Sequence, residues 1–202
     1  MKILYVDASV RPDSRTKRIA RYLLDRIPAE KKIVNLGEED IRPLNNELLE
    51  LRTRLSAEKE FENAIFHYAK DYAEADMIII VAPYWDLSFP ASLKNYIETI
   101  NVNGIVFRYS DDGNVEDLCN AKKLVYITTS GGKIISDEFG FGYVKALAQK
   151  FHGIEEVEYI KAEELDIEGA KVEEILQKAE KKVDKILEDE TAWQIEKWQI
   201  FI

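Results

Sequence analysis

The stretch Met77-Ile-Ile-Ile-Val-Ala82, followed at once by Pro83-Tyr-Trp-Asp86, decides the fold class of this chain. Six apolar residues in a row, ended by a proline, are typical of a strand that is buried on both faces of a parallel sheet. Residues 88–100 then place apolar side chains at helical spacing. A buried strand that passes through an aromatic loop into a helix indicates an α/β protein, and such proteins bind ligands outside the carboxyl ends of their strands.

The same alternation of strand and helix patterns continues on both sides of this stretch. Strands are expected at residues 3–6, 32–36, 77–82, 123–128 and 157–160, and helices at 15–27, 58–74, 88–100, 137–151 and 167–187. Residues 37–56 are polar and irregular and are expected to form a long crossover with some helix. Right-handed crossovers leave few topologies for such a chain. We expect a flavodoxin-like three-layer sandwich, with a five-stranded parallel sheet in the order 2-1-3-4-5 and a ligand between the first and third strands.

Two segments interrupt this alternation. Residues 104–109 read Gly-Ile-Val-Phe-Arg-Tyr and lead to Asp111-Asp-Gly113, a pattern that predicts a small hairpin or extended excursion. The end of the chain, residues 191–202, carries two tryptophans and several other large apolar side chains. Burial of each such side chain stabilises a protein by about 1.5–3 kcal/mol. We therefore expect this tail to pack on its own subunit or on a partner.

Composition limits the class of protein. The chain has 202 residues, 46% of them hydrophobic, and a formal net charge of −10, with no dense basic patch. These values favour one folded domain over residues 1–202 and argue against nucleic acid or an anionic membrane as a partner. The chain opens directly into a strand pattern and contains no apolar run of membrane-spanning length. We expect a soluble cytoplasmic protein without a signal peptide.

Few residues offer an alternative chemistry. Cys119 is the single cysteine and has no nearby histidine, so a surface thiol is expected there rather than a nucleophile. His67 and His152 lack a second ligand at metal spacing and are expected to be ordinary residues on or at the ends of helices, so no metal site is predicted. No Gly-x-Ser-x-Gly elbow is present.

The first candidate site is the loop Ser9-Val-Arg-Pro-Asp-Ser-Arg-Thr16, which joins a strand to a helix N-terminus. Free N–H groups and the helix dipole favour an anion there. The sequence lacks the glycine-rich dinucleotide and P-loop fingerprints, so hydroxyls and amides suit a single terminal phosphate better than a pyrophosphate. Candidate phosphate ligands are Ser9, Arg11, Ser14, Arg15 and Thr16. In the alternative interpretation, Ser14 only caps the helix.

Two further loops follow strands that would end at the same edge of the sheet. Pro83, Tyr84, Trp85 and Asp86 follow the strand at residues 77–82, and the two aromatic rings are expected either to flank a planar ligand or to belong to the local core. Thr129, Ser130, Gly131 and Gly132 follow the strand at residues 123–128. Paired glycines let a backbone approach a ligand closely and present its N–H groups. A loop that suits a phosphate, a loop with two aromatic rings and a turn rich in amides together suit a mononucleotide with a flat ring. FMN is such a mononucleotide.

The same stretches resemble the FMN-dependent NADH azoreductases, a flavodoxin-like family that also reduces quinones. The resemblance is carried by Ser9 with Ser14-Arg-Thr16, by residues 83–86 with Ser92-Leu-Lys-Asn-Tyr96 and residues 104–109, and by Ile127-Thr-Thr-Ser-Gly-Gly132. It spans most of the chain to about residue 160 and fades in residues 37–56 and in the tail. The chain departs from the family pattern at Thr16, where serine is more usual, and in Pro83-Tyr-Trp-Asp86, where Pro-Met-Tyr-Asn is commoner.

The resemblance implies an FMN-dependent NADH azoreductase or NADH:quinone oxidoreductase. NADH or NADPH would reduce the flavin, and small planar acceptors such as quinones, azo compounds or nitroaromatics would then take the electrons in the same place by a ping-pong mechanism. No side chain is assigned to catalysis, because the flavin carries the chemistry. The resemblance also implies a homodimer whose partner covers the flavin. Phe107 and Tyr109 are candidate walls of the substrate pocket, although Phe107 has the alternative role of packing the hairpin onto the core.

Two other functions remain open at this level. A flavodoxin-like electron carrier would bind FMN without turning over NADH. A flavin-free α/β protein would use the same loops merely as helix caps. The visible spectrum of the purified protein, and its response to NADH and a quinone, distinguishes the three.

Overall fold

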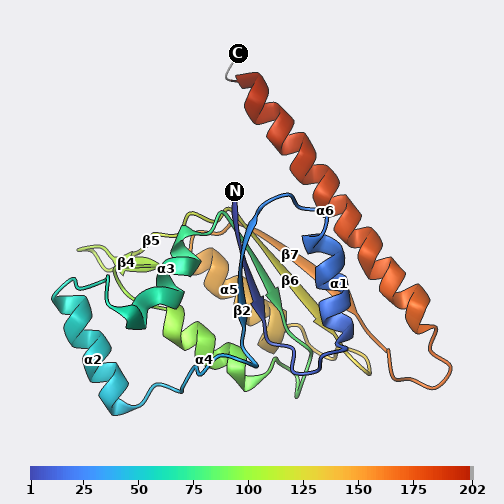
Figure 1. Cartoon of the computed structure of the whole chain (residues 1–202), viewed down its shortest axis with the longest axis horizontal. Coiled ribbons are helices and arrows are strands. Elements are labelled where there is room, and N and C mark those ends of the chain that lie inside the picture. Colours follow the sequence, from blue (N-terminus) through green and yellow to red (C-terminus); the bar gives the residue numbers. More distant parts are fainter. Residues whose placement is uncertain (201–202) are drawn as a thin grey trace.

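A parallel five-stranded sheet forms the centre of the molecule (Figure 1). The computed structural model describes the backbone of residues 1–200 and the side chains of residues 1–188. The strands of the sheet are β1 (Lys2–Asp7), β2 (Glu30–Asn35), β3 (Met77–Val81), β6 (Lys123–Thr129) and β7 (Glu156–Ala162). Their order is β2-β1-β3-β6-β7, which confirms the predicted order 2-1-3-4-5 of a flavodoxin-like fold.

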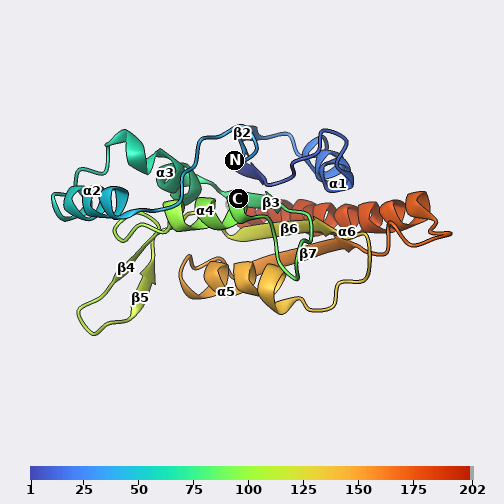
Figure 2. The same ribbon diagram turned by 90° about the horizontal axis from the view of Figure 1, so that it is seen from below.

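Helices cover both faces of this sheet (Figure 2). They are α1 (Arg15–Leu24), α2 (Asn46–Ala57), α3 (His67–Glu74), α4 (Ala91–Ile100), α5 (Tyr143–Lys150) and α6 (Val172–Ile200), with a short 3-10 helix η1 (Ala64–Phe66) before α3 and a π-helical turn η2 (Glu138–Gly142) before α5. Helices α1 and α6 pack on one face, while α3, α4 and α5 pack on the other. The predicted three-layer arrangement is therefore confirmed.

Strand β3 explains why the core divides in this way. All five of its side chains are buried, and they alternate between the two faces. Ile79 joins the cluster under α1 and α6, while Ile78 and Ile80 join the cluster under α3, α4 and α5. A strand that is covered on both faces needs a continuous apolar run, as the sequence has at residues 77–82.

Several predicted helices begin later in the structure. The helix predicted from residue 58 starts only at η1, because residues 58–63 form turns after α2, in which Lys59 has a φ of 57°. The helix predicted from Ser88 starts at Ala91, with Pro90 in the N-cap position. A proline has no N–H to donate and disfavours helical conformation in the residue before it. The helix predicted from residue 167 starts at Val172, after Gly169 with a φ of 78°.

The predicted hairpin is present and lies outside the central sheet. Strands β4 (Phe107–Tyr109) and β5 (Val115–Asp117) pair antiparallel. The segment after β5 carries Cys119 into the core, where it is 5% exposed and its thiol donates to the carbonyl of Val106. The expectation of a surface thiol was wrong, and burial raises the pKa of Cys119 to about 12. The sequence did not indicate this, because Asp117, Asn120 and Lys122 around Cys119 are typical of a polar turn.

The end of the chain contributes the long helix α6, which extends beyond the sheet (Figure 1). The predicted packing of the apolar tail at residues 191–202 concerns side chains outside the described residues. Among the described residues, no helix combines the length and the apolar character needed to cross a membrane.

Candidate functional site

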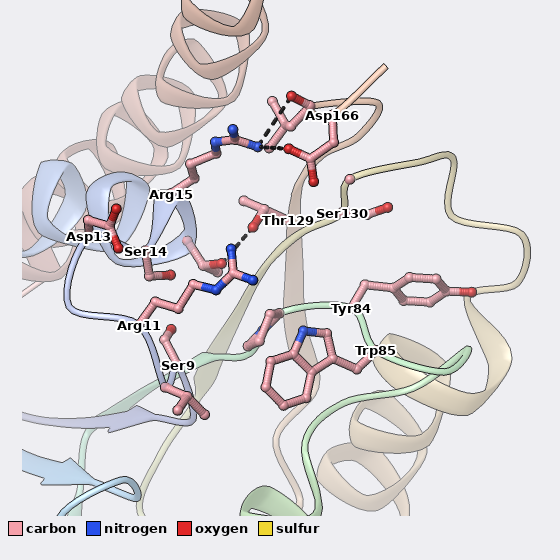
Figure 3. A pocket seen from close by; sticks show the side chains of 15 residues that line it. Ser9, Arg11, Asp13, Ser14, Arg15, Tyr84, Trp85, Thr129, Ser130 and Asp166 are labelled. Carbon is pink, nitrogen blue, oxygen red and sulfur yellow. Dashed lines mark hydrogen bonds and ion pairs between the residues drawn. The ribbon is translucent and has the colours of Figure 1, made fainter. Parts of the chain in front are cut away.

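A cavity of about 350 Å³ opens at the carboxyl edge of the sheet, beside the ends of β1, β3 and β6 (Figure 3). Its walls come from the loops that follow β1, β3, β6 and β7. The lining residues are Ser9, Val10, Arg11, Asp13, Ser14, Arg15, Thr16, Pro83, Tyr84, Trp85, Thr129, Ser130, Gly131, Leu165 and Asp166. The cavity lies at the topological switch point, where the chain leaves β1 in one direction for β2 and in the other for β3.

One end of the cavity is the N-terminus of α1. Ser14 is the N-cap residue, and its hydroxyl accepts a hydrogen bond of 3.4 Å from the N–H of Lys17. The N–H groups of Arg15 and Thr16 are at the start of the helix, where no intrahelical acceptor exists. The helix dipole and these free donors favour an anion at this end. The capping role of Ser14 and a role in anion binding are therefore compatible.

A buried ion pair beneath the loop holds it in shape. Asp7 ends β1, and its carboxylate lies 3.2 Å from Nζ of Lys17. The same carboxylate accepts a hydrogen bond of 2.8 Å from the N–H of Ser9. Because Lys17 neutralises Asp7, the carboxylate does not leave an uncompensated negative charge below the anion end of the cavity.

Ser9 supplies a polar atom without a partner. The residue is 2% exposed, and its hydroxyl has no hydrogen-bond partner among the residues that the structure describes. A buried hydroxyl without a partner costs about 1–3 kcal/mol, so native proteins rarely tolerate it without a reason. Ser9 lines the cavity, and an anion bound at the start of α1 would satisfy its hydroxyl.

Thr16 and Thr129 connect the first loop to the end of β6. Their hydroxyl groups lie 2.7 Å apart and share a buried hydrogen bond. Thr16 is 1% exposed, so its side chain is already engaged within the protein. The contribution of Thr16 to anion binding therefore rests on its backbone N–H.

The other end of the cavity is aromatic. Figure 3 shows the indole of Trp85 turned toward Arg11, while the ring of Tyr84 is turned away from it. The hydroxyl of Tyr84 points to the carbonyl of Ser136 at 3.5 Å, and its N–H donates to the carbonyl of Thr129 at 3.0 Å. Trp85 remains 44% exposed. Of the two aromatics, Trp85 is thus the one that offers an open face to a planar ligand.

The aromatic loop turns sharply beyond Trp85. Trp85 and Ser88 exchange backbone hydrogen bonds of 3.0 and 2.8 Å, and the two residues between them have φ values of 50° (Asp86) and 68° (Leu87). Residues other than glycine rarely adopt such φ values. The hydroxyl of Ser88 donates to the carbonyl of Phe139 at 2.6 Å, so the turn is attached to the segment before α5.

The third wall combines the turn after β6 with the loop after β7. The carbonyls of Gly131 and Gly132 accept backbone hydrogen bonds. Among the described residues, the N–H groups of these two glycines donate no hydrogen bond. A Cβ added to Gly131 would lie 2.3 Å from Oδ2 of Asp166. A side chain at position 131 would therefore displace the Asp166 carboxylate from its place beside this turn.

The cavity contains most of the residues proposed from the sequence. Ser9, Arg11, Ser14, Arg15, Thr16, Pro83, Tyr84, Trp85, Thr129, Ser130 and Gly131 line it. Asp86 and Gly132 lie next to lining residues but do not line it themselves. Phe107 and Tyr109 lie on the β4–β5 hairpin and are not part of its wall; Phe107 is 8% exposed and packs edge-on against Phe151.

The sequence interpretation missed the loop after β7. Leu165 and Asp166 line the cavity, together with Val10 and Asp13 from the first loop. A signal for Asp166 was available, because the loop after the fifth parallel strand ends at the same edge of the sheet as the other three. The side chain itself follows no motif that would mark it.

The residues present fit a mononucleotide that carries one phosphate and one flat ring. Ser9, Ser14 and the amides that begin α1 suit the phosphate, and the Trp85 indole suits the ring. The unpartnered hydroxyl of Ser9 is the observation that most directly demands a ligand. A pyrophosphate would require the glycine-rich turn that this loop lacks.

Comparison with known proteins found a family model and curated relatives that match most of the chain. A family model described as "Flavodoxin-like fold" matches residues 1–187. The chain is 36% identical over 187 residues to "FMN-dependent NADH:quinone oxidoreductase 2" of Clostridium acetobutylicum, covering 87% of this chain and 92% of the relative. It is also 36% identical over 199 residues to "FMN-dependent NADH:quinone oxidoreductase" of Coprothermobacter proteolyticus, covering 92% and 97%.

Solved structures share the fold. An azoreductase from Bacillus anthracis str. Sterne superimposes with a TM-score of 0.80 at 21% identity, covering 92% of this chain and 98% of the other. An FMN-dependent NADH-azoreductase from Bacillus anthracis str. Ames Ancestor, solved in complex with FMN, gives a TM-score of 0.76 at 20% identity, with 92% and 96% covered.

Proposed function

Because the chain belongs to the flavodoxin-like family that includes the FMN-dependent NADH:quinone oxidoreductases, we propose that it is an enzyme that passes two electrons from NADH through bound FMN to quinones or azo compounds. One observation supports the assignment of this function to the cavity. The unpartnered, buried hydroxyl of Ser9 lies at one end of a cavity whose other end is the open indole of Trp85. That combination suits a phosphate at one end and a flat ring at the other.

The residues of the cavity would hold the cofactor in distinct ways. The hydroxyls of Ser9 and Ser14, together with the N–H groups of Arg15 and Thr16, would bind the phosphate. The candidate set also includes Arg11, Pro83, Tyr84, Trp85, Asp86, Thr129, Ser130, Gly131 and Gly132. The chemistry that FMN supplies when bound is two-electron hydride transfer, received from the nicotinamide and passed to the acceptor.

The free N–H groups of Gly131 and Gly132 point to a further role for the third wall. Fixed backbone donors stabilise negative charge in a ligand at little reorganisation cost. We assign these two amides to the edge of the ring system on which negative charge accumulates after reduction. No side-chain acid is required in this scheme, because water can protonate the product.

The cavity supports a ping-pong sequence in which nicotinamide and acceptor occupy the same place in turn. Trp85 is exposed, and the neighbouring loops leave one side of the aromatic end open. An open aromatic surface distinguishes poorly among flat acceptors, so quinones, azo compounds and nitroaromatics all belong to the proposed substrate class. Phe107 and Tyr109 stay candidate pocket residues only for an acceptor that reaches beyond this cavity.

A homodimer is part of the proposal. Besides Trp85, large apolar side chains are exposed near the carboxyl edge: Val10, Leu87, Ile135 and Phe139. Exposed apolar side chains that gather in this way are typical of interaction sites. A second copy of the chain that covers them would also shield the flavin from water.

We further propose that residues 1–202 act as one FMN-binding domain in the cytoplasm.

The visible spectrum of the purified protein tests the function. We expect bound flavin after incubation with FMN, bleaching on addition of NADH under anaerobic conditions, and recovery of the colour when a quinone is added. A protein that stays colourless with FMN contradicts the proposal. A protein that binds FMN but accepts electrons singly and does not turn over NADH would be an electron carrier instead.

Substitution of Ser14 and Thr16 by alanine tests the phosphate end. The double variant removes one hydroxyl at the start of α1 and one that positions the loop, so we expect weaker retention of FMN. Equilibrium dialysis against FMN measures the change. An unchanged affinity would rule out a role of these two side chains in holding the phosphate.

A further inference from the structure

The loop after β7 lies along the third wall of the cavity. Its N–H groups donate three backbone hydrogen bonds to the turn after β6: Glu164 to Gly132 at 3.0 Å, Leu165 to Ser130 at 3.2 Å and Asp166 to Gly131 at 2.9 Å. These bonds place the Asp166 carboxylate at the edge of the cavity. The position of the carboxylate is thus set by the backbone and not by the side chain alone.

Arg15 connects this loop to the anion end of the cavity. Its Nη1 donates to Oδ1 of Asp166 at 2.7 Å and to the carbonyl of Leu165 at 3.3 Å. Figure 3 shows the guanidinium extended toward Asp166 and away from Ser9 and Ser14. The backbone of Arg15 therefore lies at the start of α1, and its guanidinium binds the loop after β7.

This arrangement places a carboxylate beside a site built for an anion. With Asp166 ionised, the positive charge of Arg15 is balanced by a neighbour instead of by a ligand. The side chains of Arg15 and Asp166 are 40% and 67% exposed, so solvent weakens their attraction and the pair can be exchanged for a better partner. A bound phosphate dianion offers such a partner.

We propose that Asp166 is a positioning residue that lowers the affinity of the cavity for the phosphate of FMN by engaging the guanidinium of Arg15. The inference rests on the proposed function, because it takes FMN as the ligand. It goes beyond that function in assigning to one carboxylate the control of how tightly the cofactor is held. It also makes the effect specific to the phosphate end of the ligand.

The Asp166→Asn variant tests the charge of the carboxylate alone. Asparagine keeps the size of the side chain and an oxygen that accepts from Arg15, and the backbone bonds of the loop are unaffected. We expect the dissociation constant for FMN to fall about two- to fivefold, the range that corresponds to an exposed ion pair. Quenching of flavin fluorescence on titration with apoprotein measures it.

Two controls separate this effect from others. Riboflavin has the same ring system but no phosphate, so its dissociation constant should stay unchanged in Asp166→Asn. Glu168→Gln removes the same charge from the same loop at an exposed residue that does not line the cavity, and it should leave FMN affinity unchanged. Thermal unfolding of each variant, followed by circular dichroism, verifies that the fold is retained.

The Arg15→Gln background tests whether Asp166 acts through Arg15. In that background, Asp166→Asn should change FMN affinity less than in the native chain. Equal gains in both backgrounds would overturn the inference, because they would show direct repulsion of the phosphate. Weaker FMN binding in Asp166→Asn, or an equal gain for riboflavin, would overturn it as well. Failure of the native chain to bind FMN at all would instead refute the proposed function.

Discussion

The two ends of the cavity are held in different ways. The phosphate end, defined here as Ser9, Ser14, Thr16 and Thr129, has buried or partly buried side chains and internal hydrogen bonds, as at Thr16, which is 1% exposed. The aromatic end, residues 83–88, has an exposed Trp85 and a turn with two residues of positive φ. Both ends follow strands of the same sheet, so the difference comes from the loops and not from the scaffold.

This difference matches two different tasks. A site that holds one fixed group gains affinity when its donors are already in place, because little conformational entropy is lost on binding. A surface that receives several flat molecules in turn gains more from an open aromatic face. The phosphate end is thus suited to retain the cofactor, and the aromatic end to admit and release substrates.

The largest expected effect concerns Ser9. Its buried hydroxyl has no partner among the described residues, and phosphate would supply one. Replacing Ser9 by alanine should weaken FMN binding by about 1.5–3 kcal/mol, the range for a hydrogen bond to a charged group. The apoprotein should lose no stability, because the substitution removes a buried polar atom without a partner. Fluorescence titration and urea unfolding of the apoprotein measure the two quantities.

Thr128 provides the matched control for Ser9. Its hydroxyl is also buried and without a partner among the described residues, but it does not line the cavity. Thr128→Val should therefore leave FMN affinity unchanged while, as with Ser9→Ala, not destabilising the apoprotein. A loss of affinity in both variants would show that the hydroxyls act through the fold and not through contact with the ligand.

The second effect concerns the hydrogen bond between Thr16 and Thr129. Thr16→Val leaves the hydroxyl of Thr129 without a partner and should reduce the free energy of unfolding by about 1–3 kcal/mol. Replacing both threonines by valine removes both polar atoms, so the double variant should be more stable than the two single losses predict. Strict additivity in urea unfolding would show that the two side chains are not coupled.

The third effect concerns the turn at the aromatic end. Leu87 has a φ of 68°, a conformation that costs a residue with a Cβ about 1–2 kcal/mol. Leu87→Gly should therefore be more stable than Leu87→Ala by about 1 kcal/mol, since both remove the leucine side chain but only glycine relieves the strain. FMN affinity should not change, because Leu87 does not line the cavity. Higher stability of the alanine variant would contradict the assigned conformation.

The smallest effect is expected at Tyr84. Its hydroxyl lies 3.5 Å from the carbonyl of Ser136, at the outer limit of a hydrogen bond. Tyr84→Phe should change stability by less than about 0.5 kcal/mol and leave FMN affinity intact. Trp85→Leu should instead weaken FMN binding, because it removes the exposed aromatic face that suits the flat ring of the cofactor. Equal effects of the two variants on FMN affinity would remove the distinction between these neighbouring rings.

The sequence was most informative where one physical requirement dominates. The unbroken apolar run of β3 can hardly be anything other than a strand buried on both faces, and the order of the sheet followed from the right-handed crossovers. The phosphate loop was recognisable because hydroxyls precede a helix, and Ser14 is indeed the N-cap residue. These features depend on neighbours in the chain.

The sequence was least informative where distant segments meet. The late start of α3 depends on the turns at residues 58–63, where Lys59 has a positive φ. The residue type of Lys59 does not predict this φ. The burial of Cys119 depends on the hairpin that folds over it. The contribution of Asp166 depends on three backbone bonds between loops that are more than 30 residues apart. Local sequence patterns do not indicate such contacts between distant segments.

The sequence by itself determined the alternation of strands and helices, and with it the edge of the sheet at which a ligand is expected. Periodicity and helix capping are local properties, so they are readable from the chain. Only the tertiary structure decided that Trp85 and not Tyr84 offers an open face to a planar ligand, that the hydroxyl of Thr16 is already bonded to Thr129, and that Asp166 engages Arg15. Each of these depends on side-chain directions and on packing between segments far apart in sequence, which are set only when the loops come together at the edge of the sheet.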